Sequence, residues 1–169
     1  MKKYILSLAA LLLIGTATLS AQRVAVVDIN QVLEGLAEYQ GAQKELDKLA
    51  AEWRQEIASE YDAIKSMYNK YQAEQVLLSD EVRRQREEAI VNREKAVRER
   101  QKQRFGPDGA LFKRRQQMVQ PIQDKVYSAL EDFASAQDFD IVLDKGGSAG
   151  ILFANPRFDK TEELIKRLR

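Results

Sequence analysis

A long, narrow pattern of apolar residues constrains the fold of this chain more than any other feature. Between Gln31 and Ala136 the sequence is highly charged, and its apolar residues recur at alternating steps of three and four. This spacing is that of the a and d positions of a coiled coil. A stripe so narrow cannot form a globular core, so we expect two helices packed as a long antiparallel arm. The seam residues are Leu46, Ala50, Trp53, Ile57, Ile64, Met67 and Tyr71 on the outgoing half, and Phe112, Val119, Ile122, Val126, Ala129 and Phe133 on the return.

Two local signals punctuate this arm. Ser79 precedes two acidic residues, which is typical of a helix N-cap and first turn, and predicts that the chain reverses there. Residues 105–109 hold two glycines and a proline, which cannot continue a regular helix. A kink or bulge is favoured over a phosphate-binding loop, which needs a preceding strand and a Lys-Ser/Thr ending. If the hairpin folds about Ser79, Phe105 lies opposite Trp53, and we expect the two rings to pack together.

The first 21 residues have the pattern of a secretory signal. Lys2 and Lys3 precede an apolar run over residues 5–14, and a stretch of small residues follows over 15–21. The run is too short for a membrane span. We expect cleavage near Ala21 and an exported protein, with cleavage after Ser20 or an uncleaved anchor as the alternatives.

The sequence contains neither cysteine nor histidine. Disulfides, the usual zinc sites, Ser-His-Asp triads and Cys-His pairs are therefore excluded. Carboxylates alone could still catalyse a reaction, but here they are scattered along helices, where a solvated face is favoured. We expect no enzyme, no metal site and no cofactor.

Charge is unevenly divided between the two halves of the arm. Residues 31–81 hold eleven acidic and five basic side chains, whereas residues 82–115 hold twelve basic and five acidic ones. Net charges of −6 and +7 would attract each other across the hairpin. The alternative is an exposed basic strip that binds anionic lipid, acidic protein segments or nucleic acid. Export makes nucleic acid the least expected partner, and loss of residues 1–21 leaves 25 basic against 26 acidic residues, a net charge of −1.

Short apolar runs at both ends of the arm predict a small body. A strand is expected over 23–29, with Asp28 or Asn30 capping the first helix, and a β-hairpin over 139–154 whose turn is 145–149. Asp159 and Glu162 predict a capping box for a final helix. The expected organisation is a signal peptide (1–21), body (22–40), coiled-coil arm with its tip near 75–82 and its break at 105–109 (41–120), and body again (121–169).

Such a body cannot bury its own apolar surface. Three short strands leave exposed edges and an uncovered face, which pairing between subunits would cover. We therefore expect an oligomer without a stable folded monomer. The candidate core residues of that oligomer are Val24, Val26, Ile141, Leu143, Ile151 and Phe153.

The chain resembles the Skp/OmpH family of exported chaperones. The resemblance rests on the strand 24–28, the long charged hairpin, the Phe-Asp-Ile-Val-Leu-Asp run at 139–144, and the Leu-Phe-Ala-Asn-Pro-Arg-Phe-Asp-Lys-Thr run at 152–161. It implies a mainly α, jellyfish-like homotrimer, with a small β-barrel-like body and three arms around a cavity. It also implies an ATP-independent holdase that encloses unfolded outer-membrane β-barrel proteins. Known members are strongly basic and associate with lipopolysaccharide or anionic lipid, whereas this chain is nearly neutral.

Two other functions fit the same pattern. One is a structural coiled-coil adaptor of the envelope with a single fixed partner, and the other is a protein that binds an anionic lipid surface or another polyanion through the basic half of the arm. Candidate contacts for an unfolded client are side chains outside the seam and near the tip; for the two tyrosines, partial burial on the hairpin flank is the alternative. These candidates are Tyr61, Tyr68, Val76, Leu77, Leu78, Arg83, Arg84 and Arg86.

Overall fold

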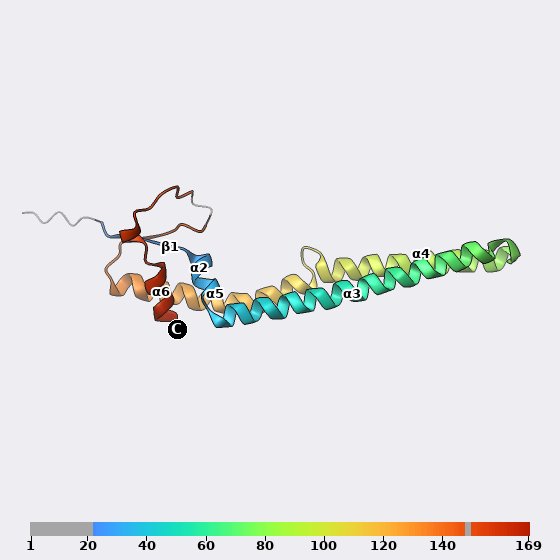
Figure 1. Ribbon diagram of the computed structural model, residues 1–169, viewed down its shortest axis with the longest axis horizontal. Coiled ribbons are helices and arrows are strands. Elements are labelled where there is room, and N and C mark those ends of the chain that lie inside the picture. Colours follow the sequence, from blue (N-terminus) through green and yellow to red (C-terminus); the bar gives the residue numbers. More distant parts are fainter. Residues whose placement is uncertain (1–21, 148–149) are drawn as a thin grey trace, which may run out of the picture.

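The computed structural model describes residues 22–147 and 150–169. The predicted signal peptide (1–21) and part of the predicted turn (148–149) lie outside these residues. A small body carries one long arm, and both halves of that arm run side by side for its whole length (Figure 1). In the described part of the chain, no helix is both long and apolar enough to cross a membrane.

The arm is the predicted helical hairpin. Helix α3 (Ala37–Glu74) runs outward, the short 3-10 turn η1 (Gln75–Leu77) forms the tip, and helices α4 (Asp80–Phe105) and α5 (Ala110–Ala136) return. At roughly 1.5 Å per residue, the 38 residues of α3 span about 57 Å. The Ser79 hydroxyl accepts a hydrogen bond from the Val82 amide at 3.4 Å, which confirms the predicted cap of α4.

The break at residues 106–109 separates α4 from α5 and projects from the side of the arm as a loop (Figure 1). Trp53 and Phe105 pack edge to face beside it, with ring centroids 6.1 Å apart, as predicted. The guanidinium of Arg104 lies 5.1 Å from the Trp53 ring. Pro121, in contrast, lies inside α5 without ending it.

The body is built on both ends of the chain. Helix α2 (Ile29–Glu34) begins at Asp28, whose carboxylate accepts a hydrogen bond from the Gln31 amide at 3.0 Å, as one of the two expected caps. The chain then bends at Gly35 before α3 starts. Helix α6 (Thr161–Leu168) packs against α2 and α5.

The predicted β-hairpin over 139–154 is wrong. Strand β2 (Ile141–Asp144) pairs instead in parallel with β1 (Val24–Val27), in a register that joins Val24 to Ile141 and Val27 to Asp144. Residues 150–155 form no strand, and the 3-10 turn η2 (Pro156–Phe158) follows them. An alternating apolar run predicts extended chain but does not name its partner, and the arm brings β1 and β2 together from opposite ends of the sequence.

The predicted capping box of α6 is also wrong in part. The Asp159 carboxylate does accept the Thr161 amide at 3.0 Å. Glu162 instead accepts a hydrogen bond from the Gln31 side chain at 3.2 Å, so it joins α6 to α2 rather than closing the box. Because Glu162 is engaged by Gln31 of another helix, it does not cap the N-terminus of its own helix.

Two separate apolar clusters hold the chain together. The cluster in the body joins α2, the start of α3, the end of α5 and α6; its buried members are Val27, Ile29, Val32, Leu33, Leu36, Ala42, Ile122, Val126, Phe133, Leu164 and Ile165. The cluster in the arm is a thin seam between α3 and α4; its buried members are Ile57, Ile64, Tyr71, Ile90 and Val97.

Candidate functional site: the surface of the arm

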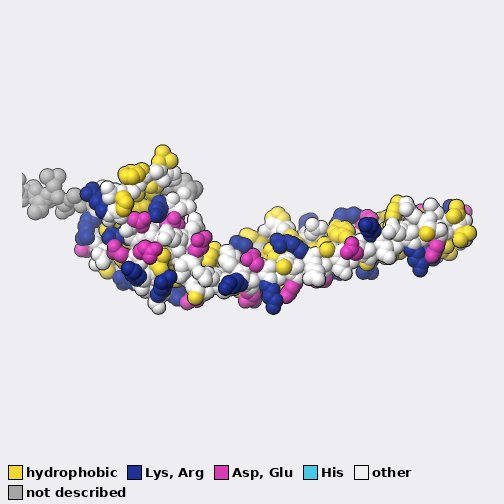
Figure 2. Space-filling model, viewed as in Figure 1, with side chains coloured by type: hydrophobic (Ala, Val, Ile, Leu, Met, Phe, Trp, Pro, Cys, Tyr) yellow, Lys and Arg dark blue, Asp and Glu magenta, His cyan; other side chains and the backbone are white. Residues whose placement is uncertain are grey.

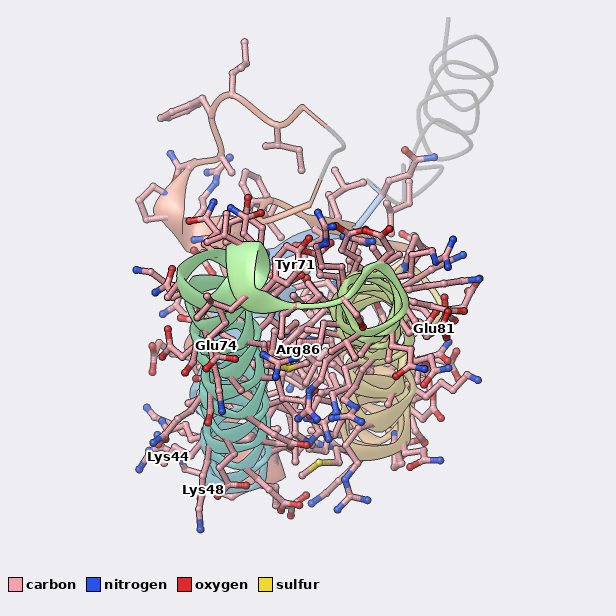
Figure 3. All side chains as sticks on the ribbon, turned by 90° about the vertical axis from the view of Figure 1, so that its right-hand side faces the viewer. Lys44, Lys48, Tyr71, Glu74, Glu81 and Arg86 are labelled. Carbon is pink, nitrogen blue, oxygen red and sulfur yellow. The ribbon has the colours of Figure 1, made fainter. Side chains whose placement is uncertain are left out.

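Ion pairs across the hairpin flank the apolar seam. In each of them the acidic residue lies on α3 and the basic residue lies on a returning helix, which confirms the predicted attraction between the two halves. Figure 3 looks along the arm from its tip and shows Arg86 between the two helices, whereas Lys44 and Lys48 point away from them. The pairs are Glu38–Lys125, Glu45–Arg114, Glu56–Arg100, Glu56–Arg104, Glu60–Arg100 and Glu74–Arg86.

One of these ion pairs, and one hydrogen bond beside them, each shift a pKa. Arg104 donates to both carboxylate oxygens of Glu56, at 2.6 and 3.1 Å, and this hydrogen bonding lowers the pKa of Glu56. Tyr71, inside the seam, donates its hydroxyl proton to Glu87, which raises the pKa of Tyr71. The contacts therefore favour the charged form of Glu56 and the neutral form of Tyr71.

The predicted client-contact residues divide into exposed and packed ones. At the tip, the side chains of Val76 and Leu77 are 87% and 85% exposed, whereas Leu78 packs against the seam cluster of the arm. Tyr61 and Tyr68 are exposed on the flank of α3, and the Tyr61 hydroxyl lies 3.4 Å from the Gln101 side chain. Figure 2 shows the apolar side chains gathered at the far end of the arm.

Each of the three tip arginines is engaged by an acidic residue. Arg83 pairs with Asp80, and Arg84 pairs with Glu81 at 3.3 Å, each within the first turns of α4. Arg86 reaches across the hairpin to Glu74 at 2.5 Å. The tip is therefore a mixed surface of cations and anions rather than a bare cationic strip.

The residues expected to form an oligomer core are only partly covered in the single chain. Val26 is buried and Val24 and Ile151 are half-buried, but Ile141, Leu143 and Phe153 are exposed, the last by 81%. Leu152, which the sequence argument did not select, is 99% exposed. Leu152 lies in the predicted strand at 150–154, which the structure does not form, so alternation along a strand does not decide which side chains of this run are covered.

Sequence reasoning also missed exposed apolar residues on the returning helices. Val91 and Tyr127 each follow a buried seam residue directly, so helical phase alone would have placed them on the flank. Phe112 was assigned to the seam, but its side chain, in the first turn of α5 next to the break, is exposed.

The arm carries shallow hollows between its helices. One is lined by Met67, Lys70, Arg86, Ala89 and Ile90, and another, beside the break, by Arg54, Ile57, Ala58, Tyr61, Gln101 and Phe105. In residues 22–147 and 150–169, no three histidine, cysteine or acidic side chains gather in a group that could hold a metal ion. What this surface offers is weak, non-covalent contact with apolar and charged groups.

The comparison with protein families decides which class the chain falls in, because residues 23–168 match the family described as outer membrane protein (OmpH-like). The chain belongs to the OmpH-like family. A crystal structure from Caulobacter crescentus CB15, described as an OmpH-like outer membrane chaperone, shares the fold with a TM-score of 0.73. It is 14% identical, over 91% of this chain and 88% of that one. A comparison with curated proteins finds no significant match.

Proposed function

We propose that this OmpH-like protein is an ATP-independent periplasmic holdase that binds unfolded outer-membrane β-barrel proteins between its arms and keeps them from aggregating. The observation that carries the proposal is the uncovered apolar surface along and at the end of a slender arm. Val76 and Leu77 stand almost fully in solvent at the tip, and Tyr61 and Tyr68 lie along the flank. The relative from Caulobacter, described as an outer membrane chaperone, supports the same role.

The proposed mechanism follows from the thinness of the arm. Two helices around a single seam leave no deep cavity, so each contact with a client is weak and non-directional. Several arms acting on one chain convert weak contacts into useful affinity, because binding at the second arm is intramolecular. We propose a homotrimer whose strands pair between subunits in a barrel-like body. The exposed Leu152, Phe153, Ile141 and Leu143 of the single chain support that assembly.

The first experiment measures aggregation directly. A denatured outer-membrane β-barrel protein is diluted into buffer with and without the mature protein (residues 22–169) and no ATP. Light scattering and the oligomer mass are recorded on the same sample. We expect scattering to be suppressed at about one trimer per client. Unchanged aggregation in the presence of a folded oligomer would leave the adaptor or the polyanion-binding function.

A variant of the tip tests which surface is used. Replacing Val76 and Leu77 together by Ser removes apolar area that the hairpin itself does not bury, so folding should be unaffected. We expect the amount of protein needed for half-maximal suppression to rise severalfold. Tyr127→Ser, which removes a half-exposed aromatic side chain from α5 instead of the tip, is the control and should behave as the unmodified protein. Equal loss in both variants would contradict a role for the tip.

A further inference from the structure

Two of the ion pairs across the arm lie in the heptad series that contains the seam residue Met67. On α3, positions 60, 67 and 74 are spaced by seven residues, and on α4, positions 86, 93 and 100 are spaced in the same way. Glu60 pairs with Arg100, and Glu74 pairs with Arg86. Two helices packed in register therefore bring the middle positions, Met67 and Arg93, opposite each other.

We call each pair of facing positions a rung. The middle rung, formed by positions 67 and 93, has no acidic residue. Met67 stands where the positions seven residues before and after it are glutamate, so the register sets Arg93 opposite a thioether instead of a carboxylate. The residues three and four positions from Arg93 on its own helix are all apolar, namely Ala89, Ile90, Ala96 and Val97. Within residues 22–147 and 150–169, neither Arg93 nor Lys70 forms an ion pair.

A hollow of about 200 Å³ lies at this rung. Its lining is formed by the apolar side chains of Met67, Ala89 and Ile90 and by two cations, Lys70 and Arg86, of which Arg86 is paired with Glu74. Arg93 does not line the hollow itself, but it lies three and four residues after Ile90 and Ala89, and therefore on the same face of α4. The arm therefore combines an apolar floor with positive charge that the protein leaves uncompensated.

We infer that this hollow is a binding site for an acidic residue of an unfolded polypeptide together with an apolar side chain near it. The carboxylate takes the place of the missing glutamate and pairs with Arg93 and Lys70, while the apolar side chain covers Met67, Ala89 and Ile90. This inference rests on the proposed function and names one element of client recognition.

The size and position of the hollow favour a polypeptide over a lipid. Small-molecule sites enclose roughly 300–1,000 Å³, so this hollow fits a side chain rather than a whole amphiphile. It lies on the side of the arm, more than one helical turn from the tip, where a membrane surface would first meet the protein. Extended segments of outer-membrane barrels alternate apolar with polar residues, so an acidic and an apolar side chain two positions apart project to the same side.

The test supplies the missing carboxylate by a substitution in the protein itself. In Met67→Glu the protein supplies the carboxylate, whereas Met67→Gln loses the same apolar contact without adding charge. The probe is a fluorescent peptide with a repeated Leu-Thr-Asp sequence, and its counterpart carries Asn for Asp. Fluorescence anisotropy should show that Met67→Glu weakens binding of the Asp peptide about five- to tenfold relative to Met67→Gln, because one charge-assisted contact is lost. Arg93→Gln should weaken it similarly, and the Asn peptide should bind weakly to every variant.

Other outcomes overturn the inference. Equal binding by Met67→Glu and Met67→Gln would show that Arg93 recognises no carboxylate, and if the unmodified protein still suppressed aggregation, the proposed function would stand without this site. The opposite result is also possible: the Met67 variants change peptide binding as expected, but the unmodified protein does not suppress aggregation. The binding site would then stand and the proposed holdase function would be wrong. Loss of binding to phosphatidylglycerol vesicles in Met67→Glu, with peptide binding unchanged, would make the occupant a lipid.

Discussion

Asp159 joins three parts of the body through one carboxylate. Its oxygens accept the Lys145 ammonium at 2.7 Å and both the amide and the hydroxyl of Thr161. The Thr161 hydroxyl in turn accepts the Asp28 amide at 2.9 Å, so β1, the end of β2 and the start of α6 share one network. Burial raises the pKa of Asp159, but the hydrogen bonds from Lys145 and Thr161 outweigh it and lower that pKa to about 2.

This network predicts a particular dependence of stability on pH. The folded-state pKa of Asp159 lies below its ordinary value of 3.8, so the carboxylate stabilises the fold fully above about pH 4. That contribution is lost as the pH falls from about 4 to about 2. Asp159→Asn should therefore be less stable than the unmodified protein at pH 7, and the difference should shrink below pH 4. Urea unfolding at a series of pH values and fixed protein concentration measures it, and a difference independent of pH would contradict the prediction.

At the scale of the element, the shape of the arm depends on the two glycines in the loop between α4 and α5. At Gly106 a Cβ atom would collide with the Lys102 carbonyl oxygen, and at Gly109 it would lie 2.8 Å from the Arg104 carbonyl oxygen. Both glycines therefore permit a backbone approach that closes the loop between α4 and α5. Gly41, inside α3, has no neighbouring atom within 4 Å of such a Cβ.

Two alanine substitutions should consequently act in opposite directions. Gly41→Ala should raise the free energy of unfolding by about 0.5–1 kcal/mol, because alanine loses less backbone entropy in a helix. Gly106→Ala should lower it by about 1–3 kcal/mol, because the loop must shift away from Lys102. Thermal unfolding followed by circular dichroism compares the two. A stabilising Gly106→Ala would show that the loop is not held closed by this approach.

The helices and strands also show which kinds of feature can be predicted from the sequence and which cannot. The seam, the cap at Ser79, the break and the Trp53–Phe105 contact all follow from local patterns or from a hairpin whose two halves must match. The pairing of β1 with β2 joins residues more than a hundred positions apart, and no local pattern encodes which edges meet. The Asp159 network was missed for the same reason, since a helix cap was expected where a tertiary junction formed.

Only some residues of the candidate surface could be predicted, because the exposure of a side chain depends on its angular position around the helix as well as on its residue type. Tip residues such as Val76 and Leu77 lie beyond the last seam position, so their exposure could be anticipated. The unpaired state of Arg93 could not, because a count of charges on the two halves of the arm shows attraction but not which rung lacks an acid.

At the scale of the whole molecule, the body leaves apolar side chains in solvent at the end opposite the tip. Figure 2 shows them above the body, over the segment that precedes η2. Leu152 and Phe153 contribute most of this exposure. The β1 edge of the two-stranded sheet is partly covered by a bridge from Val26 to Asp159, and the apolar patch beside the sheet is a surface that association would cover.

Replacing Leu152 and Phe153 together by Ser should therefore reduce the mass of the proposed oligomer without unfolding the arm. Sedimentation velocity gives the mass, and circular dichroism gives the helix content. The Val76 and Leu77 double serine variant is the matched control, because it removes similarly exposed side chains from the other end of the molecule and should keep the oligomer intact. An unchanged mass for both variants would show that another surface makes the contact.

The ion pairs of the arm carry a numerical symmetry with consequences for its length. Glu56 with Arg104, Glu60 with Arg100 and Glu74 with Arg86 are each centred on residue 80, as if the sequence were reflected there. A reflected sequence can be lengthened or shortened only in matched pieces. Seven residues removed from one limb leave the other limb with no counterpart, whereas seven removed from both preserve every remaining pair. The length of the arm can therefore change only in steps of about two helical turns. Each step needs two insertions or deletions, one in each limb, at distant places in the gene.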